Sequence, residues 1–295
     1  MPLPTSFRRS GIIACAAVLF STTGAACADT PETTPAPAYD SYVALGDSFT
    51  AGPGIPPQTE GDPCGRSGRN YPTLVAADLG IEDFVDASCS GADTPDLSQP
   101  QIAFGGAAVP PQYDSLRPET DLVSVGIGGN DIGLVQLALG CVNFSPPPQG
   151  TSCAVTNTSG GIDRVDAAID AFAPTYAAIV DEIRRRSPDA RIVLVGYPTG
   201  VRDGGCFPQQ PIWPEDATYL QSKIDRLNTV MRKQAEASDV DYVDLQDSTR
   251  LHDACATSET RWMEGLQLAP GSIPLHPNAA GHRNAADRIA AELDS

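Results

Sequence analysis

The sequence predicts a three-layer α/β domain, in which helices cover both faces of a sheet of about five parallel strands. Five short apolar segments have the composition of strands, and helical patterns alternate with them along the chain. The strand candidates are residues 42–45, 84–87, 122–127, 192–195 and 240–245. Two of these, YVAL at 42–45 and IVLV at 192–195, are continuous apolar runs. Such runs are typical of strands that are covered on both faces in a parallel sheet.

Apolar residues at spacings of three and four mark the helices. The clearest stripe runs from Ile162 to Ile183 in steps of 3, 4, 3, 4, 3 and 4 residues, which is the period of one helix face. Pro174 lies off this stripe and is expected to kink or split the helix. A second stripe lies within 220–231, and a last helix is expected over 278–293. Three Gly- and Pro-rich stretches are expected to be loops: 52–69, 100–118 and 140–160.

The charge balance excludes two broad classes of function. The 295 residues include 19 Lys and Arg against 37 Asp and Glu, which gives a formal net charge of -18 at pH 7. An acidic surface repels phosphate backbones and anionic lipid headgroups. We therefore expect no nucleic-acid partner and no electrostatic docking on membranes. With 41% hydrophobic residues, the chain has enough apolar material for a packed core.

The N-terminus has the three parts of a secretory signal peptide. Arg8 and Arg9 precede an apolar stretch at 11–20, and small residues then lead to Ala-Cys-Ala at 26–28. The apolar stretch is too short for a stable membrane span. We therefore expect a secreted, extracellular protein whose residues 1–28 are removed.

The remaining chain divides into a short lead-in and one domain. Residues 29–38 are rich in Pro and Thr and are expected to be flexible, and residues 39–295 are expected to form a single domain. An alternative concerns the cleavage point, because Gly-Ala-Ala-Cys at 24–27 weakly resembles a lipoprotein box. In that case Cys27 would carry a lipid anchor.

Six cysteines follow the leader, at positions 64, 89, 141, 153, 206 and 255. An even number of cysteines in an exported chain indicates disulfides. Zinc is the competing interpretation, but the chain has no C-x-x-C pair and only three histidines. We expect disulfides and no metal, and the residues alone leave the pairing open.

Polar residues follow the predicted strands at the edge where parallel sheets bind ligands. Ser48 follows the first strand, Gly91 the second and Asn130 the third, and His276 lies in a turn downstream of the fifth. A serine nucleophile needs a base within hydrogen-bond reach and donors aimed at the developing oxyanion. We expect Ser48 to be the nucleophile and His276 the base. The N–H groups of Ser48 and Gly91 and the amide of Asn130 are the expected oxyanion hole.

Each motif alone also has a purely structural explanation. Gly-Asp-Ser is a common turn sequence, and Gly-Gly-Asn-Asp at 128–131 is compatible with an ordinary strand-to-helix turn. The glycines at 126–129 do not complete G-x-G-x-x-G, so dinucleotide binding is excluded. Of the other histidines, His282 lies on the last helix and is expected to be a packing or surface residue, while His252 is a further candidate for the site. The joint presence of the motifs, in order and at strand ends, favours catalysis.

At these residues the chain resembles the SGNH hydrolases, which are also called GDSL lipases and esterases. Ser48 in GDSFTAG, Gly91 in CSGA, Asn130 in GGND and His276 in HPN match the four blocks of that family, in order, between about residues 40 and 293. The resemblance implies a flavodoxin-like α/β/α sandwich that hydrolyses carboxylic esters without a cofactor. The α/β-hydrolase fold, which carries G-x-S-x-G in mid-chain, does not fit the position of Ser48.

The chain is also similar to secreted actinobacterial lipases of that family. This similarity implies three sequential disulfides, which in order along the chain are Cys64–Cys89, Cys141–Cys153 and Cys206–Cys255. One departure concerns Ile273, which stands where most family members have an Asp three residues before the His. The group that orients His276 is then either a main-chain carbonyl within 272–274 or a distant acid, Asp253 or Asp203. The carbonyl is favoured because it is local.

These observations predict a secreted serine ester hydrolase, a lipase or esterase, that acts on an acyl ester as a monomer. Two alternatives remain open at this point. One is a deacylase or acyltransferase of cell-wall glycans, and the other is a non-catalytic surface binding module on the same fold. The sequence leaves the acyl chain length and the head group of the substrate open.

Overall fold

The computed structural model describes residues 39–266 and 273–295. The predicted signal peptide at 1–28, the alternative lipid anchor at Cys27 and the lead-in at 29–38 lie outside the described residues. None of the helices within the described residues combines the length and the apolar character that crossing a membrane requires.

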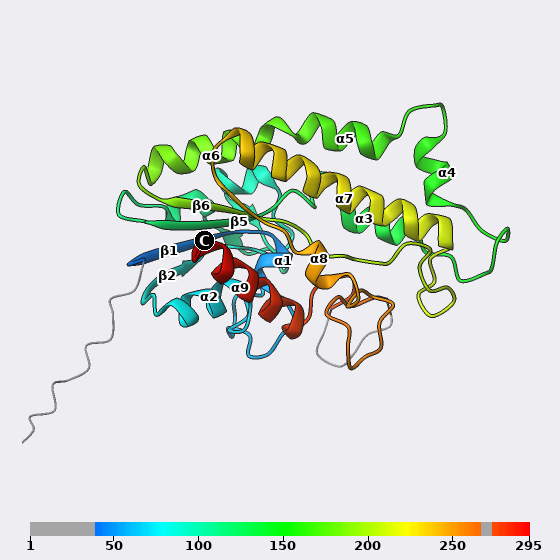
Figure 1. Cartoon of the computed structure of the whole chain (residues 1–295), viewed down its shortest axis with the longest axis horizontal. Helices are drawn as coiled ribbons and strands as arrows, with labels where there is room; N and C mark the ends of the chain where they lie inside the picture. Colours follow the sequence, from blue (N-terminus) through cyan, green and yellow to red (C-terminus); the bar gives the residue numbers. More distant parts are fainter. Residues whose placement is uncertain (1–38, 267–272) are drawn as a thin grey trace, which may run out of the picture. The chain divides into compact units, whose positions relative to one another are not determined.

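A five-stranded parallel sheet lies at the centre of the domain (Figure 1). Its strands are β1 (Ser41–Gly46), β2 (Asp83–Asp86), β5 (Leu122–Gly126), β6 (Arg191–Val195) and β7 (Asp241–Val243). The strand order is β2-β1-β5-β6-β7, and every neighbouring pair is parallel. This is the flavodoxin-like order, so the predicted fold class is confirmed.

The helices cover both faces of the sheet. On one face lie α2 (Tyr71–Leu79) and α9 (Ala279–Leu293), and on the other α5 (Arg164–Phe172), α6 (Pro174–Arg186) and α7 (Pro214–Ala237) (Figure 1). The shorter elements are the α-helices α1 (Ser48–Ala51), α3 (Leu134–Gly140), α4 (Cys153–Thr158) and α8 (Gln246–Thr249), the 3₁₀ helices η1 (Thr94–Leu97) and η2 (Gln112–Ser115), and the hairpin strands β3 (Gln101–Ile102) and β4 (Ala108–Val109).

Alternation along the strands divides the core into two clusters. In β1, Tyr42 and Ala44 join the cluster beneath α2 and α9, whereas Val43 and Leu45 join the cluster beneath α5, α6 and α7. Successive side chains of a strand point to opposite faces, and all four are fully buried. Both faces of the central sheet are therefore buried at this strand, as its continuous apolar sequence indicates.

The expected helix boundaries need two corrections. The stripe that starts at Ile162 enters a helix only at Arg164, because Asp163 caps it by accepting the N–H groups of Val165 and Asp166. The chain does divide at the expected proline, since α5 ends at Phe172 and α6 begins at Pro174. The last helix begins one residue later than expected, with Asn278 as its N-cap.

The three stretches expected as loops differ in the structure. Residues 52–69 contain no regular helix or strand. The stretch 100–118 contains the β3–β4 hairpin and η2, and 140–160 contains α4, whose N-cap Ser152 accepts the N–H of Val155. Short elements of this kind leave no apolar period long enough to read in a sequence.

Candidate active site

Ser48 is the first residue of α1, and a single residue, Asp47, separates it from the end of β1. The carboxylate of Asp47 caps this short helix by accepting the N–H of Phe49 at 2.8 Å. Gly46 is required at the turn because a Cβ atom there would clash with the Thr50 hydroxyl oxygen. The amide of Gln112 holds the same glycine from the other side, with bonds of 2.8 and 2.9 Å to its N–H and carbonyl. The turn therefore presents Ser48 in one fixed place.

His276 lies within hydrogen-bond distance of Ser48, and its other ring nitrogen meets a backbone carbonyl. Its Nε2 is 2.7 Å from the Ser48 hydroxyl oxygen, and its Nδ1 is 2.7 Å from the carbonyl oxygen of Pro274. A carbonyl only accepts, so Nδ1 carries the ring proton and Nε2 is free to accept from Ser48. Leu275 adopts the left-handed φ of 61°, which turns the chain sharply between this carbonyl and the imidazole.

The two distant acids that the sequence left as rivals are engaged elsewhere. Asp253 is fully buried and forms an ion pair with Arg202 at 2.7 Å. Asp203 accepts a hydrogen bond from the Thr218 hydroxyl. Within the described residues, the acceptor for His276 Nδ1 is therefore the Pro274 carbonyl. Burial lowers the pKa of His276 below its usual 6.5, and the hydrogen bond to Pro274 opposes this only in part.

The loops that carry Gly91 and Asn130 are tied to each other. The Asn130 side-chain amide donates to the carbonyl of Ala92 at 2.8 Å, directly beside Gly91. An amide nitrogen has a second N–H to donate. Gly91 adopts a left-handed φ of 82°, and its N–H has no acceptor among the described residues. These two groups are thus equipped to donate to an oxyanion.

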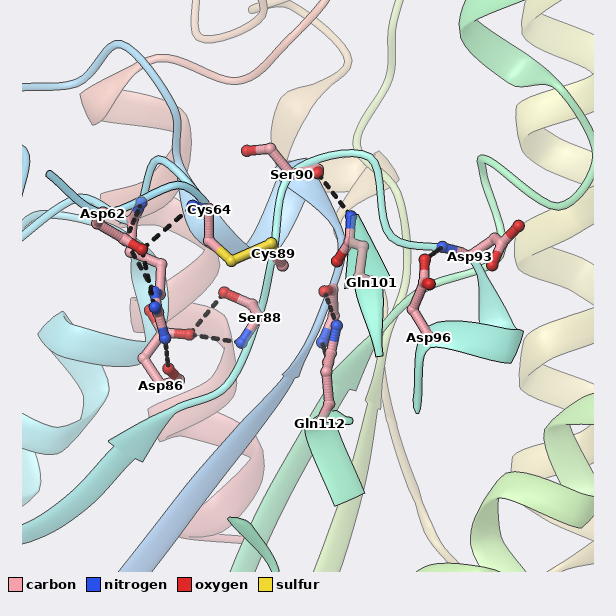
Figure 2. The surroundings of a disulfide bond; sticks show 12 residues. Asp62, Cys64, Asp86, Ser88, Cys89, Ser90, Asp93, Asp96, Gln101 and Gln112 are labelled. Carbon is pink, nitrogen blue, oxygen red and sulfur yellow. Dashed lines mark hydrogen bonds and ion pairs between the residues drawn. A yellow bond between two sulfur atoms is a disulfide. The ribbon is translucent and has the colours of Figure 1, made fainter. Parts of the chain in front are cut away.

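The disulfide Cys64–Cys89 anchors the Gly91 loop to the loop over 52–69. Figure 2 shows the bridge among hydrogen-bonded polar side chains on both sides. Asp62 binds Arg66 beside Cys64, and Gln101 donates to the carbonyl of Ser90 at 3.0 Å beside Cys89. The other two bridges are Cys141–Cys153 and Cys206–Cys255. All three pairs are those that the family resemblance implies.

A buried hydrogen-bonded group that the sequence analysis did not identify connects Ser48 to the Asn130 loop. The Tyr197 hydroxyl donates to Asp47 at 2.6 Å and accepts the N–H of Gly129 at 2.7 Å. Asp47 is only 1% exposed, and burial raises its pKa to about 7 against the opposing hydrogen bonds from Tyr197 and Phe49. The sequence feature that could have pointed to Tyr197 is its position directly after the fourth predicted strand, since ligand-site residues of such sheets lie at the ends of strands.

The other two histidines make their hydrogen bonds outside the Ser48–His276 pair. His282 is buried in α9, where its Nδ1 accepts the N–H of Tyr71 at 3.1 Å, as expected for a packed histidine. His252 stacks on Trp262 with ring centroids 3.5 Å apart and contacts the carbonyl of Thr260. It belongs to the loop beside His276, not to the pair with Ser48.

An apolar cavity adjoins the Ser48–His276 pair. It is lined by Phe49 and Leu275, which are the chain neighbours of Ser48 and His276, and by Leu134 and Ala138 of α3. Met263 also lines this cavity. Since α3 follows the Asn130 loop, the cavity lies between the elements that carry the site.

A flavodoxin-like sheet with a serine and a histidine hydrogen-bonded at its carboxyl edge is the arrangement of a class of hydrolases. Residues 44–283 match the GDSL-like Lipase/Acylhydrolase family. The chain therefore belongs to this family, which is a family of carboxylic ester hydrolases. The predicted enzyme class and the resemblance stated above are confirmed.

Relatives with names and solved structures agree with this family. The chain is 35% identical to "Lipase 2" of Streptomyces coelicolor over 83% of both chains, and 29% identical to a lipase of Streptomyces rimosus over 81% of both. It is similar in structure to phospholipase A1 from Streptomyces albidoflavus, with a TM-score of 0.71 and 26% identity over 86% of this chain and 100% of that one. The extracellular lipase of Streptomyces rimosus gives 0.70 and 27% over 85% and 99%.

Proposed function

We propose that the chain hydrolyses acyl esters through an acyl-enzyme on Ser48, with His276 as the general base. The observation that carries this proposal is the pair of 2.7 Å contacts from the two ring nitrogens of His276, one to Ser48 and one to Pro274. A serine hydroxyl becomes a nucleophile when a correctly oriented base takes its proton. A non-catalytic binding module has no need for this arrangement.

The reaction proceeds in two halves. Ser48 Oγ bonds to the ester carbonyl carbon while its proton passes to His276 Nε2, and the carbonyl oxygen becomes an oxyanion. The N–H groups of Ser48 and Gly91 and the amide of Asn130 donate to that oxyanion. His276 then returns the proton to the leaving alcohol oxygen as its bond to carbon breaks. In the second half water takes the place of the alcohol and releases the acid, which restores Ser48.

The substrate is an ester with an apolar acyl group. The cavity beside Phe49 and Leu275 is lined mainly by apolar residues, with Gln210 and Glu264 among the few polar ones, and a mainly apolar lining suits a hydrocarbon chain. The relatives named as lipases and as phospholipase A1 act on lipids, which supports the same substrate class here. A cell-wall glycan, the alternative left by the sequence, would need more polar groups than Gln210 and Glu264 in this cavity to bind its many hydroxyls.

Export is part of the proposal. The signal peptide at 1–28 would deliver the domain at 39–295 to the outside of the cell, where its three disulfides persist. The similar lipase of Streptomyces rimosus is extracellular, which supports this location. Mass spectrometry of the secreted protein distinguishes cleavage after Ala28 from lipid attachment at Cys27.

The proposed mechanism is tested with p-nitrophenyl esters of graded chain length. We expect turnover by the unmodified protein and none by Ser48→Ala, with equal thermal unfolding midpoints. A fluorescent phosphonate should label Ser48 and leave Ser90, another buried serine near the site, unlabelled. Retained activity in Ser48→Ala, or labelling at another serine, would reject Ser48 as the nucleophile.

A further inference from the structure

Two segments next to the site contain no charged side chain. Residues 97–113 and 132–162 lack Asp, Glu, Lys, Arg and His, in a chain with 19% charged residues and a net charge of -18. The first segment follows the Gly91 loop, and the second follows the Asn130 loop. The absence of charge is thus located beside the two loops that supply the proposed oxyanion donors.

The same two segments carry most of the exposed large apolar side chains of the described residues. Six of the seven lie in them: Ile102, Phe104, Leu139, Phe144, Val155 and Ile162. Phe144 is 84% exposed and Ile162 is 67% exposed. Single exposed apolar residues are normal on a soluble protein. Their concentration on uncharged segments of an acidic protein marks an interaction surface.

The surface around Phe144 is held in place by its neighbours. The disulfide Cys141–Cys153 joins the end of α3 to the start of α4. Asn143 exchanges hydrogen bonds with Thr151, at 3.0 and 3.2 Å, and the carbonyl of Ser145 accepts the indole N–H of Trp213 at 2.8 Å. Because both chain neighbours of Phe144 are anchored, its ring is kept on the outside. Figure 1 shows α3, α4 and the start of α5 at the same end of the domain.

Both segments reach the site itself. The Phe104 ring lies 3.7 Å from the position that a Cβ atom of Gly91 would occupy. In α3, Leu134 and Ala138 line the apolar cavity beside Ser48 and His276, while the next residue, Leu139, is exposed. One exposed residue of the second segment, Leu139, is therefore the chain neighbour of a residue that lines the proposed acyl cavity, and Phe104 of the first segment lies against Gly91.

We propose that these two segments dock the enzyme on the surface of an aggregated, uncharged or zwitterionic lipid, with Phe144 and Ile162 entering its apolar layer. This inference rests on the proposed function, because it names the physical state of the ester substrate. Apolar side chains without nearby charges favour such a layer. The net charge of -18 repels an anionic one. Docking by this surface would bring acyl chains close to the cavity that Leu134 and Ala138 of α3 line.

Binding is measured by flotation with vesicles of pure phosphatidylcholine, in a Ser48→Ala background so that hydrolysis does not consume the lipid. The double variants Phe144→Asp/Ile162→Asp and Phe144→Ser/Ile162→Ser should each lower the partition coefficient by at least about tenfold, which corresponds to about 1.4 kcal/mol. The matched control is Leu251→Asp, which is 78% exposed but lies between Arg250 and Asp253. It should bind as the parent does.

Activity separates docking from catalysis. With Ser48 intact, the double variants should lose at least about tenfold in turnover of vesicle lipid and keep kcat/KM on soluble p-nitrophenyl acetate. Unchanged vesicle binding in both double variants would overturn the docking surface, and so would an equal loss in Leu251→Asp. A dimer that the double variants convert to a monomer in sedimentation would assign the surface to self-association and overturn it as well. Absence of turnover on every soluble ester, with vesicle binding intact, would instead refute the proposed function.

Discussion

Tyr197→Phe tests whether one hydroxyl holds the proposed nucleophile, Ser48, and the Asn130 loop in position relative to each other. Tyr197 spans the two, since its oxygen donates to Asp47, the neighbour of Ser48, and accepts from Gly129, the neighbour of Asn130. Phenylalanine keeps the ring and its edge-to-face contact with Phe49, whose centroid is 5.1 Å away. The substitution therefore removes two hydrogen bonds and little packing.

The structure fixes the size of the expected effect on stability. Asp47 and Gly129 would each keep a buried polar atom without its partner, at about 1–3 kcal/mol per group. Their sum, about 2–6 kcal/mol, lies within the total of about 5–15 kcal/mol for a folded protein. At roughly 2–4 °C per kcal/mol for a chain of this size, the unfolding midpoint should fall by about 4–24 °C, and we expect the protein to remain folded at 25 °C.

The effect on catalysis should fall on kcat rather than on KM. Displacing the Asn130 loop would weaken a proposed donor to the oxyanion, which exists only after the substrate is bound. We expect kcat on p-nitrophenyl butyrate to fall by about 10- to 100-fold, a part of the full loss of about 10²–10³ for removing such a donor. Circular dichroism at the assay temperature confirms that the variant is folded.

Tyr176→Phe is the matched control. Tyr176 is also buried, and its hydroxyl donates to the carbonyl of Ile127 at 2.9 Å, close to Gly129 in the chain. Its loss should cost stability but leave kcat within about threefold of the parent, since it makes no contact with Asp47. Equal kcat losses in the two variants, or a change only in KM for Tyr197→Phe, would refute the positioning role of Tyr197.

The remaining predictions concern the donors, the base, the disulfide and the buried acid. Asn130→Ala should lower kcat by about 10²–10³ at constant KM in steady-state assays. The acid limb of kcat/KM should lie below pH 6.5, because burial lowers the pKa of His276; a limb above 6.5 would contradict this. Replacing Cys64 and Cys89 by Ser should cost about 2–4 kcal/mol in urea unfolding. Burial raises the pKa of Asp47 to about 7, so the folded state holds its proton more tightly and stability falls as the pH rises towards 7; Asp47→Asn should flatten this dependence between about pH 5 and 7.

The sheet and its strand-end motifs were predictable because their signals are local. A buried strand such as 192–195 is a run of apolar residues, and GDS and HPN are short strings whose neighbours lie close in sequence. The hydrogen bonds of Tyr197 have no such local signal, since Tyr197 lies 150 positions from Asp47 and 68 positions from Gly129 in the sequence. Only the folded sheet brings those positions together, and a tyrosine after a strand looks the same with or without partners.

The group that orients His276 shows a different limit of sequence reasoning. The Ile at 273 removes the expected acid, but a backbone carbonyl is present at every position, so composition does not single out Pro274. The carbonyl of Pro274 becomes the acceptor because Leu275 adopts a left-handed φ of 61°. Non-glycine residues rarely adopt this conformation, and no residue type at these positions indicates it. Its chemical consequence follows from the acceptor. A neutral carbonyl fixes the tautomer as a carboxylate would, but it gives the imidazolium less stabilisation. In the proposed mechanism His276 thus stays a neutral base to lower pH, and a larger share of the transition-state stabilisation must come from the proposed donors, Gly91 and Asn130.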